Sequence, residues 1–551
     1  MCTRSTMRLG LTLSAPALLV ACATTPPPLY DGLGTSGREV TTDSELAQAY
    51  FDQGLALCWG FNHDEALRSF NEMARLDPDC AMAHWGMAYA LGPNINRPMT
   101  DPAVAGQAHE AAQRALAMAD GASEVERALI EAQVRRFADP PPEDRGALDV
   151  AYADAMREAW RRFPDDPLLG ALFADALMNI SLDWRALGTD VERGEHTPEI
   201  VATLERVLAA APGHTGANHL YIHAVEASDR PDRALPSARR LEGLMPAAGH
   251  IVHMPSHIYI RLGMYDEAVA SNSRAVIEDD RFFAQAPRQG IYHKYRAHNH
   301  HFLAWAAMFR GSRADAIQAA RAMEAKLPSG YDAEFPAIEA YRFVPMHVMM
   351  RFGMWQEMLA EPGPGTRYAI ATALWHHGRA VAYANTDRLD AARAEAERFE
   401  SVAATIPDTT TVRRARIETL LEAARQMMWG EILFKEGEHE AAFAALRRGI
   451  AAEDSMPYAE PPGWMQPIRH SLGALLLEEG RVEEAEAVYL ADLQRHADNV
   501  WSLHGLAECL RLRGAVAEAH ACEKRFEKAS ENADTEILAS CFCRSVTTAS
   551  Q

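Results

Sequence analysis

The sequence contains none of the short motifs that mark the common nucleotide-dependent and hydrolytic enzymes. It has no Walker loop, no Rossmann glycine fingerprint and no GxSxG elbow in any of its 551 residues. His219 and His223 do not form the HExxH pattern of zinc proteases, because Leu220 rather than glutamate follows His219. Nucleotide-dependent chemistry and serine hydrolysis therefore have no support.

Basic residues are scarce relative to acidic ones. The chain has 54 Lys and Arg against 76 Asp and Glu, which gives a formal net charge of −22. A nucleic-acid partner would require clustered Lys and Arg, so we expect none. An acidic surface is compatible with cations and basic peptides, but solubility alone explains it equally well.

Sustained strand patterns are also lacking. No segment keeps alternating polar and apolar residues or is enriched in β-branched residues, so we expect no substantial sheet. A hydrophobic content of 48%, with frequent alanine, instead favours a folded and largely helical protein. Because the chain of 551 residues is too long for one small core, we expect several subdomains or an extended array.

The apolar stretch near the N-terminus is too short to span a bilayer. It covers residues 9–20 behind two arginines, as in a secretory signal. It ends in Leu19-Val20-Ala21-Cys22, which resembles the lipobox of bacterial lipoproteins, where the cysteine is lipidated and becomes the new N-terminus. The alternative is an ordinary secretory signal with a chance cysteine.

The segment after this cysteine agrees with a lipid anchor. Ala23, rather than aspartate, follows Cys22, which in Gram-negative lipoproteins favours the outer membrane. Three successive prolines then indicate a semi-rigid tether. We therefore predict a signal peptide over residues 1–22, a tether over 23–44, and an outer-membrane lipoprotein that faces the periplasm and is anchored through Cys22.

Cysteine is rare, with 8 residues in the whole chain. Processing at Cys22 would leave six unmodified cysteines in an oxidising compartment. Cys509 and Cys522 fall on the two arms of one predicted helical hairpin, so the sequence allows a disulfide between them but does not establish it. Cys541 and Cys543 lie in a polar tail, where a soft-metal contact and an unimportant exposed thiol pair are the alternatives.

A helix-pair turn recurs along the chain. It is clearest in Leu262-Gly263-Met264-Tyr265-Asp266-Glu267-Ala268, which resembles the turn and second-helix start of a tetratricopeptide repeat (TPR). Gly480 and Gly514 are 34 residues apart, the standard TPR length, whereas other intervals are longer. We therefore predict an all-α, TPR-like solenoid of helical hairpins, a right-handed superhelix with degenerate and extended repeats.

Loops and proline clusters divide this array. Breaks such as Pro140-Pro141-Pro142 and the segment 362–365 interrupt the helical pattern. The predicted parts are N-terminal helical repeats over 45–210, central histidine-rich repeats over 211–361, C-terminal TPRs over 366–531, and a polar tail over 532–551.

Between residues 214 and 301, histidines recur at equivalent positions of the repeat. In TPRs, positions 2, 5, 9 and 12 of the first helix line the concave groove. Placing Gly263 at position 15 puts three histidines of one first helix at groove positions, and the two flanking repeats follow the same registration. The residues that it directs into the groove there are His219, His223, Glu226, His250, His253, His257, His298 and His301.

This registration predicts a metal site. Neighbouring helices lie roughly 10 Å apart, so imidazoles at equal levels can converge on one ion with bonds of ~2 Å. Imidazole ligation suits zinc, copper or iron and would not select calcium or magnesium. Because the set is too large for one tetrahedral ion, either the centre is binuclear or some members orient ligands or act as acid and base. The predicted ligands are His219, His223, His253, His257, His298 and His301, with Glu226 as a candidate base.

Other side chains are candidate groove contacts for a ligand or substrate. Trp464 and Arg469 belong to a proline-rich loop that leads into a repeat helix, and two interpretations are open. The loop closes one end of the groove and offers stacking and anion contacts, or it is a plain loop anchor. The alternative for the histidines is that they bind only peptide or water. The candidate contacts are His347, His376, Tyr295, Asn299, Trp464 and Arg469.

The chain after about residue 45 resembles a family of bacterial TPR lipoproteins of unassigned activity. The resemblance implies a superhelix and usually a binding role, but no reaction. Three functions remain open: a membrane-tethered metal-binding protein, a metalloenzyme (hydrolase or oxidase) acting on a small molecule, and a metal-free scaffold that binds peptide or protein in its groove. The segments that carry the resemblance are Phe61-Asn62-His63-Asp64-Glu65-Ala66, 90–96, 253–259, 298–303 and 460–469.

Overall fold

The structure is a computed structural model that describes six stretches of the chain. These are residues 26–34, 38–99, 101–286, 290–327, 336–365 and 367–544. The predicted signal peptide and the lipidation site Cys22 lie outside the described residues. Among the described residues, no helix is long and apolar enough to cross a membrane.

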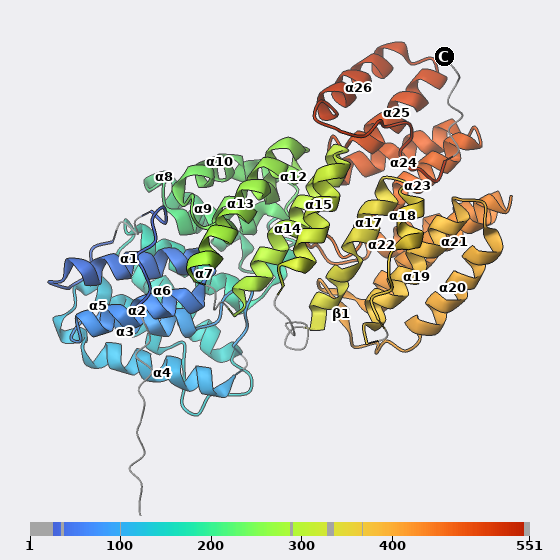
Figure 1. The fold of residues 1–551 in the computed structure, drawn as a ribbon. Helices are drawn as coiled ribbons and strands as arrows, with labels where there is room; N and C mark the ends of the chain where they lie inside the picture. The colour runs from blue at the N-terminus through green and yellow to red at the C-terminus, as the bar shows by residue number, and fades with distance from the viewer. Residues whose placement is uncertain are drawn as a thin grey trace, which may run out of the picture.

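Helices succeed one another in hairpins along the chain, and neighbouring hairpins stack side by side (Figure 1). The first part of the array carries two short 3-10 turns, η1 (Ala119–Gly121) and η2 (Asp183–Arg185). Its helices are α1 (Glu45–Trp59), α2 (His63–Leu76), α3 (Ala81–Leu91), α4 (Pro102–Ala117), α5 (Glu124–Val134), α6 (Gly146–Arg162), α7 (Pro167–Ile180) and α8 (Thr197–Ala210).

The central part contains the predicted histidine-rich repeats. Two 3-10 segments, η3 (Pro231–Ala234) and η4 (Pro336–Phe343), precede α10 and α17. The helices here are α9 (Thr215–Glu226), α10 (Leu235–Leu244), α11 (Gly249–His253), α12 (Pro255–Arg261), α13 (Tyr265–Gln285), α14 (Tyr292–Arg310), α15 (Arg313–Ala325), α17 (Val344–Arg351) and α18 (Trp355–Ala360).

The last part continues the hairpins to the C-terminal end of the described chain. Its helices are α19 (Ala369–Ala384), α20 (Leu389–Ala403), α21 (Ile417–Lys435), α22 (His439–Asp454), α23 (Ile468–Glu478), α24 (Val482–Arg495), α25 (Val500–Leu512) and α26 (Val516–Ala529). The strands of the described chain form one small antiparallel hairpin between α20 and α21, with β1 (Thr411–Val412) paired to β2 (Ala415–Arg416).

The turns have the geometry that the TPR pattern predicts. Gly263 and Gly311 end their helices with φ of +73° and +83°, a left-handed conformation that glycine adopts without steric cost. A β-carbon at Gly263 would lie 2.6 Å from the carbonyl oxygen of Ala497, so the turn also needs the missing side chain. Ala268 and Ala316 are fully buried five residues after these glycines. The predicted all-α, TPR-like solenoid is therefore confirmed.

Two large hydrophobic cores divide the array and meet near α17. The first extends from the N-terminal helices through α15, and the second from η4 to the C-terminal helices. Trp501 of α25 belongs to the first core, and its indole N–H donates to the carbonyl oxygen of Met308 in α14 at 2.8 Å. The C-terminal hairpins therefore pack back against the central repeats.

The loop between α22 and α23 enters the central repeats. Glu460 on this loop lies 3.1 Å from Nδ1 of His257, and Met465 contacts His301. The amide of Gln466 donates to the backbone carbonyl of His347. This loop, residues 455–467, therefore covers part of the groove that a plain solenoid would leave open.

The C-terminal segment is docked on the solenoid, at least to residue 544. Asp534 accepts hydrogen bonds from the first backbone N–H groups of α15, and Ser540 donates to the carbonyl oxygen of His470 at 2.9 Å. Cys541 and Cys543 are buried and joined in a disulfide. The expectation of an exposed thiol pair in a polar tail is wrong, because both cysteines are buried. The alternative of a soft-metal contact stays a prediction, since Glu431 lies with Cys541 and Cys543 in one group of possible ligands.

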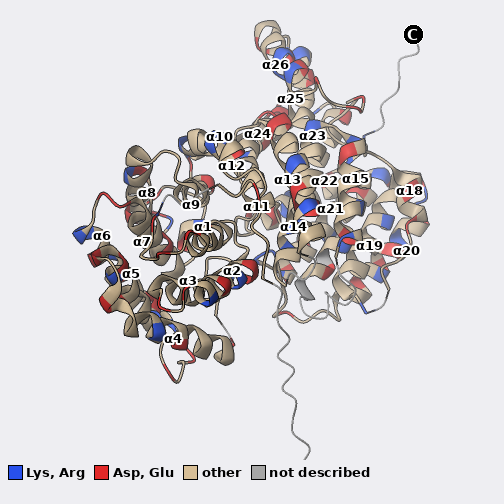
Figure 2. Cartoon of the chain, turned by 60° about the vertical axis from the view of Figure 1, so that its left-hand side comes forward, with Lys and Arg blue, Asp and Glu red and all other residues tan. Residues whose placement is uncertain are grey.

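The other four described cysteines are free and buried. Cys509 and Cys522 are among them, so the disulfide that the sequence allowed between them does not form. On the outer helices, acidic and basic residues alternate closely, for example along α4, α20 and α26 (Figure 2). This mixture agrees with a solvated surface.

Candidate metal centre

The central histidines come from the first helices of consecutive hairpins. Helix α9 contributes His219, His223 and Glu226, and α14 contributes His298. The middle repeat is broken at Met254, so that His253 ends α11 and His257 belongs to α12, which begins at Pro255. The break is slight, since the N–H of Met254 still donates to the carbonyl oxygen of His250 at 3.1 Å.

Three of these imidazoles form a first triad, made of His219, His223 and His250. One ligand atom from each lies within 4.8 Å of the others, and Nε2 of His250 is 3.3 Å from Nε2 of His219. Nδ1 of His219 donates to the carbonyl oxygen of Trp59 at 2.7 Å, which leaves the lone pair on Nε2. Nε2 of His223 is buried and has no hydrogen-bond partner.

The second triad consists of His253, His257 and His298. Nε2 of His253 lies 2.9 Å from Nε2 of His257 and 3.1 Å from Nε2 of His298. Nδ1 of His253 donates to the side-chain oxygen of Asn272 at 2.7 Å. Nδ1 of His257 faces the carboxylates of Glu226 and Glu460. The three Nε2 atoms therefore converge on one point.

Glu226 links the two triads. One of its oxygens accepts from Nδ1 of His223 at 2.9 Å, and the other accepts from Nδ1 of His257. Burial alone would raise the pKa of Glu226, but His257 and His223 hold it below the usual carboxylate range. Because both oxygens already orient rings, the geometry favours a positioning role over the base role suggested by the sequence.

These contacts determine which nitrogen of each ring carries the proton. A neutral ring that donates from Nδ1 keeps an unprotonated Nε2, and this applies to His253 in the second triad. Nε2 of His257 lies 2.9 Å from this lone pair, so the two atoms share a proton when His257 is an imidazolium, or a metal ion when both rings are neutral. The ligand atoms of a tetrahedral zinc site with bonds of ~2.0–2.1 Å lie about 3.3 Å apart. The triads thus have the spacing of metal ligands, and His219 and His253 have the tautomer that ligation requires.

Burial keeps most of these rings neutral. It lowers the pKa of His219, His250, His253 and His298 well below the ordinary histidine value. Burial would also lower the pKa of His257, but Glu226 and Glu460 raise it to about 9. Neutral imidazole is the form that binds a metal ion.

The triads differ from the predicted ligand set at two residues. His250, which the registration directed into the groove but which was not among the predicted ligands, completes the first triad. His301 lies outside both triads, since its Nε2 is 3.0 Å from the sulfur of Met465 and its ring packs on Tyr341. The physical reason is the 455–467 loop, which fills the part of the groove that His301 faces.

The candidate groove contacts have different surroundings. Tyr295 packs against the ring of His250 at a centroid distance of 4.8 Å and lines the cavity of the site. Asn299 is buried and donates to Asp279 at 2.8 Å, on the other side of α14. His376 is 2.6 Å from Glu395 in the C-terminal repeats. Tyr295 is thus the one of these three that lies at the site.

The remaining candidates form a separate group near the 455–467 loop. Trp464 is only 2% exposed and packs edge-on against His347 and His377, with ring centroids 4.9 and 5.3 Å away. Burial lowers the pKa of His347 to about 3. Arg469 pairs with Asp454 at 2.6 Å. Trp464 therefore anchors its loop in the second core, as the simpler interpretation of the sequence allowed.

A cavity of about 360 Å³ opens beside the triads. This volume is within the range of small-molecule sites. Histidines of both triads reach it, and the opposite walls carry tyrosines and cationic side chains. Its lining includes His223, Glu226, His250, His257, His298, Tyr295, Tyr341, Tyr458, Glu460, Arg185, Lys294, Arg413 and Arg414.

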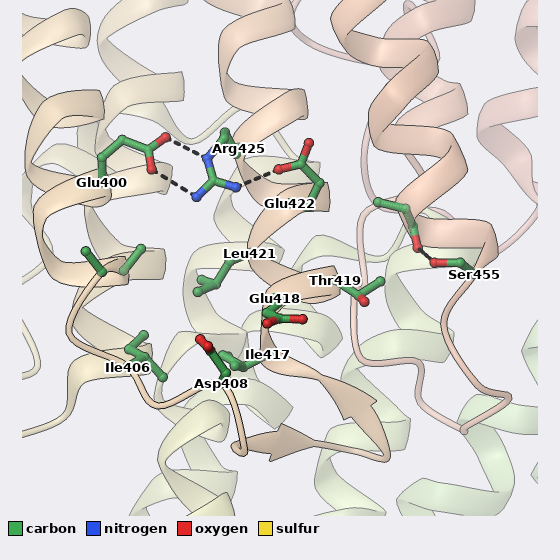
Figure 3. A pocket seen from close by; sticks show the side chains of 13 residues that line it. Glu400, Ile406, Asp408, Ile417, Glu418, Thr419, Leu421, Glu422, Arg425 and Ser455 are labelled. Atoms are coloured by element: carbon green, nitrogen blue, oxygen red, sulfur yellow. Dashed lines mark hydrogen bonds and ion pairs between the residues drawn. The ribbon is translucent and has the colours of Figure 1, made fainter.

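A larger cavity, of about 600 Å³, lies between α20, α21 and α22 (Figure 3). Its most prominent polar group, Arg425, is held between Glu400 at 2.7 Å and Glu422 at 2.6 Å. None of its described lining residues is a histidine or a cysteine. The smaller cavity beside the triads is therefore the stronger candidate for chemistry.

Comparison with known proteins does not assign the chain to a family. No family model matches it, and no curated protein matches it. Solved structures of similar length do match over most of the chain. The human IFIT1 dimer with m7Gppp-AAAA shares 12% identity, covers 90% of this chain and 92% of its own, and has a TM-score of 0.33.

Two further structures match in the same way. The APC/C hetero-tetramer Cut9-Hcn1 shares 13% identity, covers 84% of this chain and 90% of its own, and has a TM-score of 0.27. Yeast Tom70 shares 9% identity with coverages of 88% and 90% and a TM-score of 0.28. At these identities and scores the likenesses support no inference on function.

Proposed function

We propose that this protein binds transition-metal ions through two triads of imidazoles on its central repeats. The observation that carries the proposal is the convergence of three Nε2 atoms, from His253, His257 and His298, at 2.9–3.1 Å. The partner on Nδ1 of His253 holds the tautomer that a metal ion requires, and His257 would release its second proton on binding the ion. Ligation by neutral imidazoles favours zinc, copper or iron.

A metalloenzyme is the second candidate function. Each triad supplies three protein ligands, which is the number typical of catalytic sites that keep one coordination position open. The cavity of about 360 Å³ lies beside the triads and has room for a substrate. A metal-free scaffold for peptides or proteins is the third function consistent with a TPR-like fold, and in it a proton on Nε2 of His257 would hold His253 in place of the metal ion.

Elemental analysis tests the proposal directly. The protein should be produced without a nickel-affinity step, in medium supplied with zinc, copper and iron, and analysed for metals after extensive dialysis. We expect zinc, copper or iron in a fixed ratio to protein, approaching one ion for each triad. Protein that carries no metal as purified and takes up none when titrated would favour the scaffold function instead.

We also propose that the chain is a lipoprotein of the outer membrane, tethered through Cys22 and facing the periplasm. The support is the lipobox Leu19-Val20-Ala21-Cys22 with Ala23 after it. Replacing Cys22 with alanine is expected to move the protein from the outer-membrane fraction to the soluble periplasmic fraction. Recovery of the unaltered protein as a soluble, unlipidated species would contradict this proposal.

A further inference from the structure

Four cationic side chains line the cavity beside the triads, although the chain carries a net charge of −22. Arg185 lies at the end of η2, Lys294 in the first turn of α14, and Arg413 and Arg414 at the tip of the β1–β2 hairpin. Because these cations gather in one concave site of an otherwise acidic chain, they make the electrostatic potential there more positive and concentrate anions.

The carboxylates of the cavity do not form contact pairs with these cations. Glu226 uses its oxygens on His223 and His257, and Glu460 accepts from Tyr458 and lies beside His257. Within the described stretches, none of the four cationic side chains pairs with a carboxylate. Glu226 acts on Arg185 and Arg414 only through space, so no contact pair prevents these groups from binding an anion.

The guanidinium groups are instead held by neutral oxygens. Arg185 donates to the carbonyl oxygen of Ile95 at 2.8 Å, and Arg414 donates to that of Tyr458 at 3.3 Å. Burial lowers the pKa of Arg185 to about 10, so the group stays charged at neutral pH although it is removed from water. A bound anion would offset this loss of hydration.

The backbone of the β1–β2 hairpin gives an independent observation. Arg413 and Arg414 are the two residues of its turn, and their φ angles are +46° and +69°. Two-residue turns with positive φ at both positions favour Asn and Gly, because a β-carbon is strained in this conformation. Two arginines are a poor choice for the turn itself, and strain of this kind gathers at functional sites.

Part of the remaining lining is apolar or aromatic. Ile95, Leu182 and Ile291 contribute aliphatic surface, and Tyr295 and Tyr341 contribute rings. A ligand that filled the cavity would thus meet cations at one part of its surface and apolar side chains at another.

We infer that this cavity recognises a small organic anion, in which a carboxylate or phosphate group is attached to an apolar body. The inference that the cavity is a substrate pocket of the metal centre rests on the proposed function. The inference that it binds an organic anion depends only on the cationic and apolar walls.

Calorimetric titration with three probes tests the inference: benzoate, phenyl phosphate and inorganic phosphate. We expect saturable binding of benzoate or phenyl phosphate, and the stronger of the two identifies the anionic group. Inorganic phosphate should bind more weakly than phenyl phosphate, because it lacks the apolar body. Equal binding of these two would overturn the apolar part of the inference, and no binding of any probe would overturn it entirely.

Substitutions at Arg414 separate recognition from stability. Arg414→Gly and Arg414→Asn place residues that tolerate positive φ in the turn, so the thermal midpoint should stay the same or rise. Probe binding should weaken about tenfold, since one charge-assisted contact is lost. Arg416→Gln is the matched control, because Arg416 belongs to the same hairpin but pairs with Glu418 outside the cavity. Equal weakening in the Arg414 variants and in this control would overturn the inference.

The metal proposal and the anion inference can fail separately. The titrations should be repeated on chelator-treated protein, in which the cationic wall alone acts. Binding of a probe to protein that never takes up metal would support the anion site while contradicting the metal proposal. Metal uptake without any probe binding, in either form, would leave the metal proposal standing and overturn the anion site.

Discussion

Replacing His219 and His253 together with alanine is expected to abolish stoichiometric metal binding while leaving most of the helix content. His219 belongs to the first triad and His253 to the second, so the double variant removes one ligand from each. Metal content should fall below about a tenth of the wild-type value, since even changes outside the ligand set weaken affinity 10–100-fold. A solenoid distributes its stability among neighbouring interfaces, so far-UV circular dichroism should change little.

Single variants and two controls make this prediction sharper. Either alanine substitution alone should remove one ion and retain the other if the triads bind separately. His376→Ala, in the C-terminal repeats, should leave the metal content unchanged, because His376 bonds to Glu395 and lies outside the site. His301→Ala should also retain the metal, because His301 faces Met465. A double variant with wild-type metal content would show that the triads are not the site.

Replacing Asp492 with alanine is expected to cause the largest loss of stability in the C-terminal repeats. The carboxylate is buried and accepts from Nε2 of His470 at 2.9 Å, from Ser502 at 2.7 Å and from Asn499 at 3.0 Å. Arg351 in turn donates to Nδ1 of His470 at 2.5 Å. Removing one member of a buried charged network costs on the order of 3–5 kcal/mol. Urea denaturation should show this decrease, with metal content per folded protein unchanged.

The loss of stability caused by Asp492→Ala should become smaller as the pH falls. Burial would raise the pKa of Asp492, but His470 and Ser502 lower it below the ordinary aspartate value. The carboxylate therefore adds stability above the ordinary pKa of about 4, and this stability is lost as the pH falls below it. The difference between wild type and Asp492→Ala should narrow in acid. Asp232→Ala, at an exposed pair with Arg230, should cost less than about 1 kcal/mol; an equal loss in both variants would contradict the prediction.

The histidine pattern shows which parts of the site can be predicted from the local periodicity of the sequence. Equivalent positions of consecutive first helices lie side by side in any solenoid of helical hairpins, so the sequence sufficed to bring together five of the predicted histidines, in the two triads. The turn glycines Gly263 and Gly311 and the buried Ala268 and Ala316 followed from the same repeat. Each of these predictions depends on contacts within a hairpin or between adjacent hairpins.

The parts of the site that were not predicted come from distant segments. Glu460 and Met465 reach the central histidines from a loop about 160–200 residues further along the chain, and Met465 rather than a metal triad becomes the neighbour of His301. The cationic wall is assembled from η2, α14 and the β1–β2 hairpin. No periodicity relates these segments, so the sequence suggested only that the 460–469 loop closes one end of the groove and carried no signal for its contacts with His257 and His301.

The sequence by itself determined the helical repeat, the first helix of each central hairpin and the imidazoles on its groove side. Only the tertiary structure decided which imidazoles converge, that Glu226 orients rings of both triads, and that a loop covers His301. The physical reason is that helical phase is a local property, set by neighbouring residues. The path of a loop and the tautomer of a buried ring depend instead on partners that folding brings together from far along the chain.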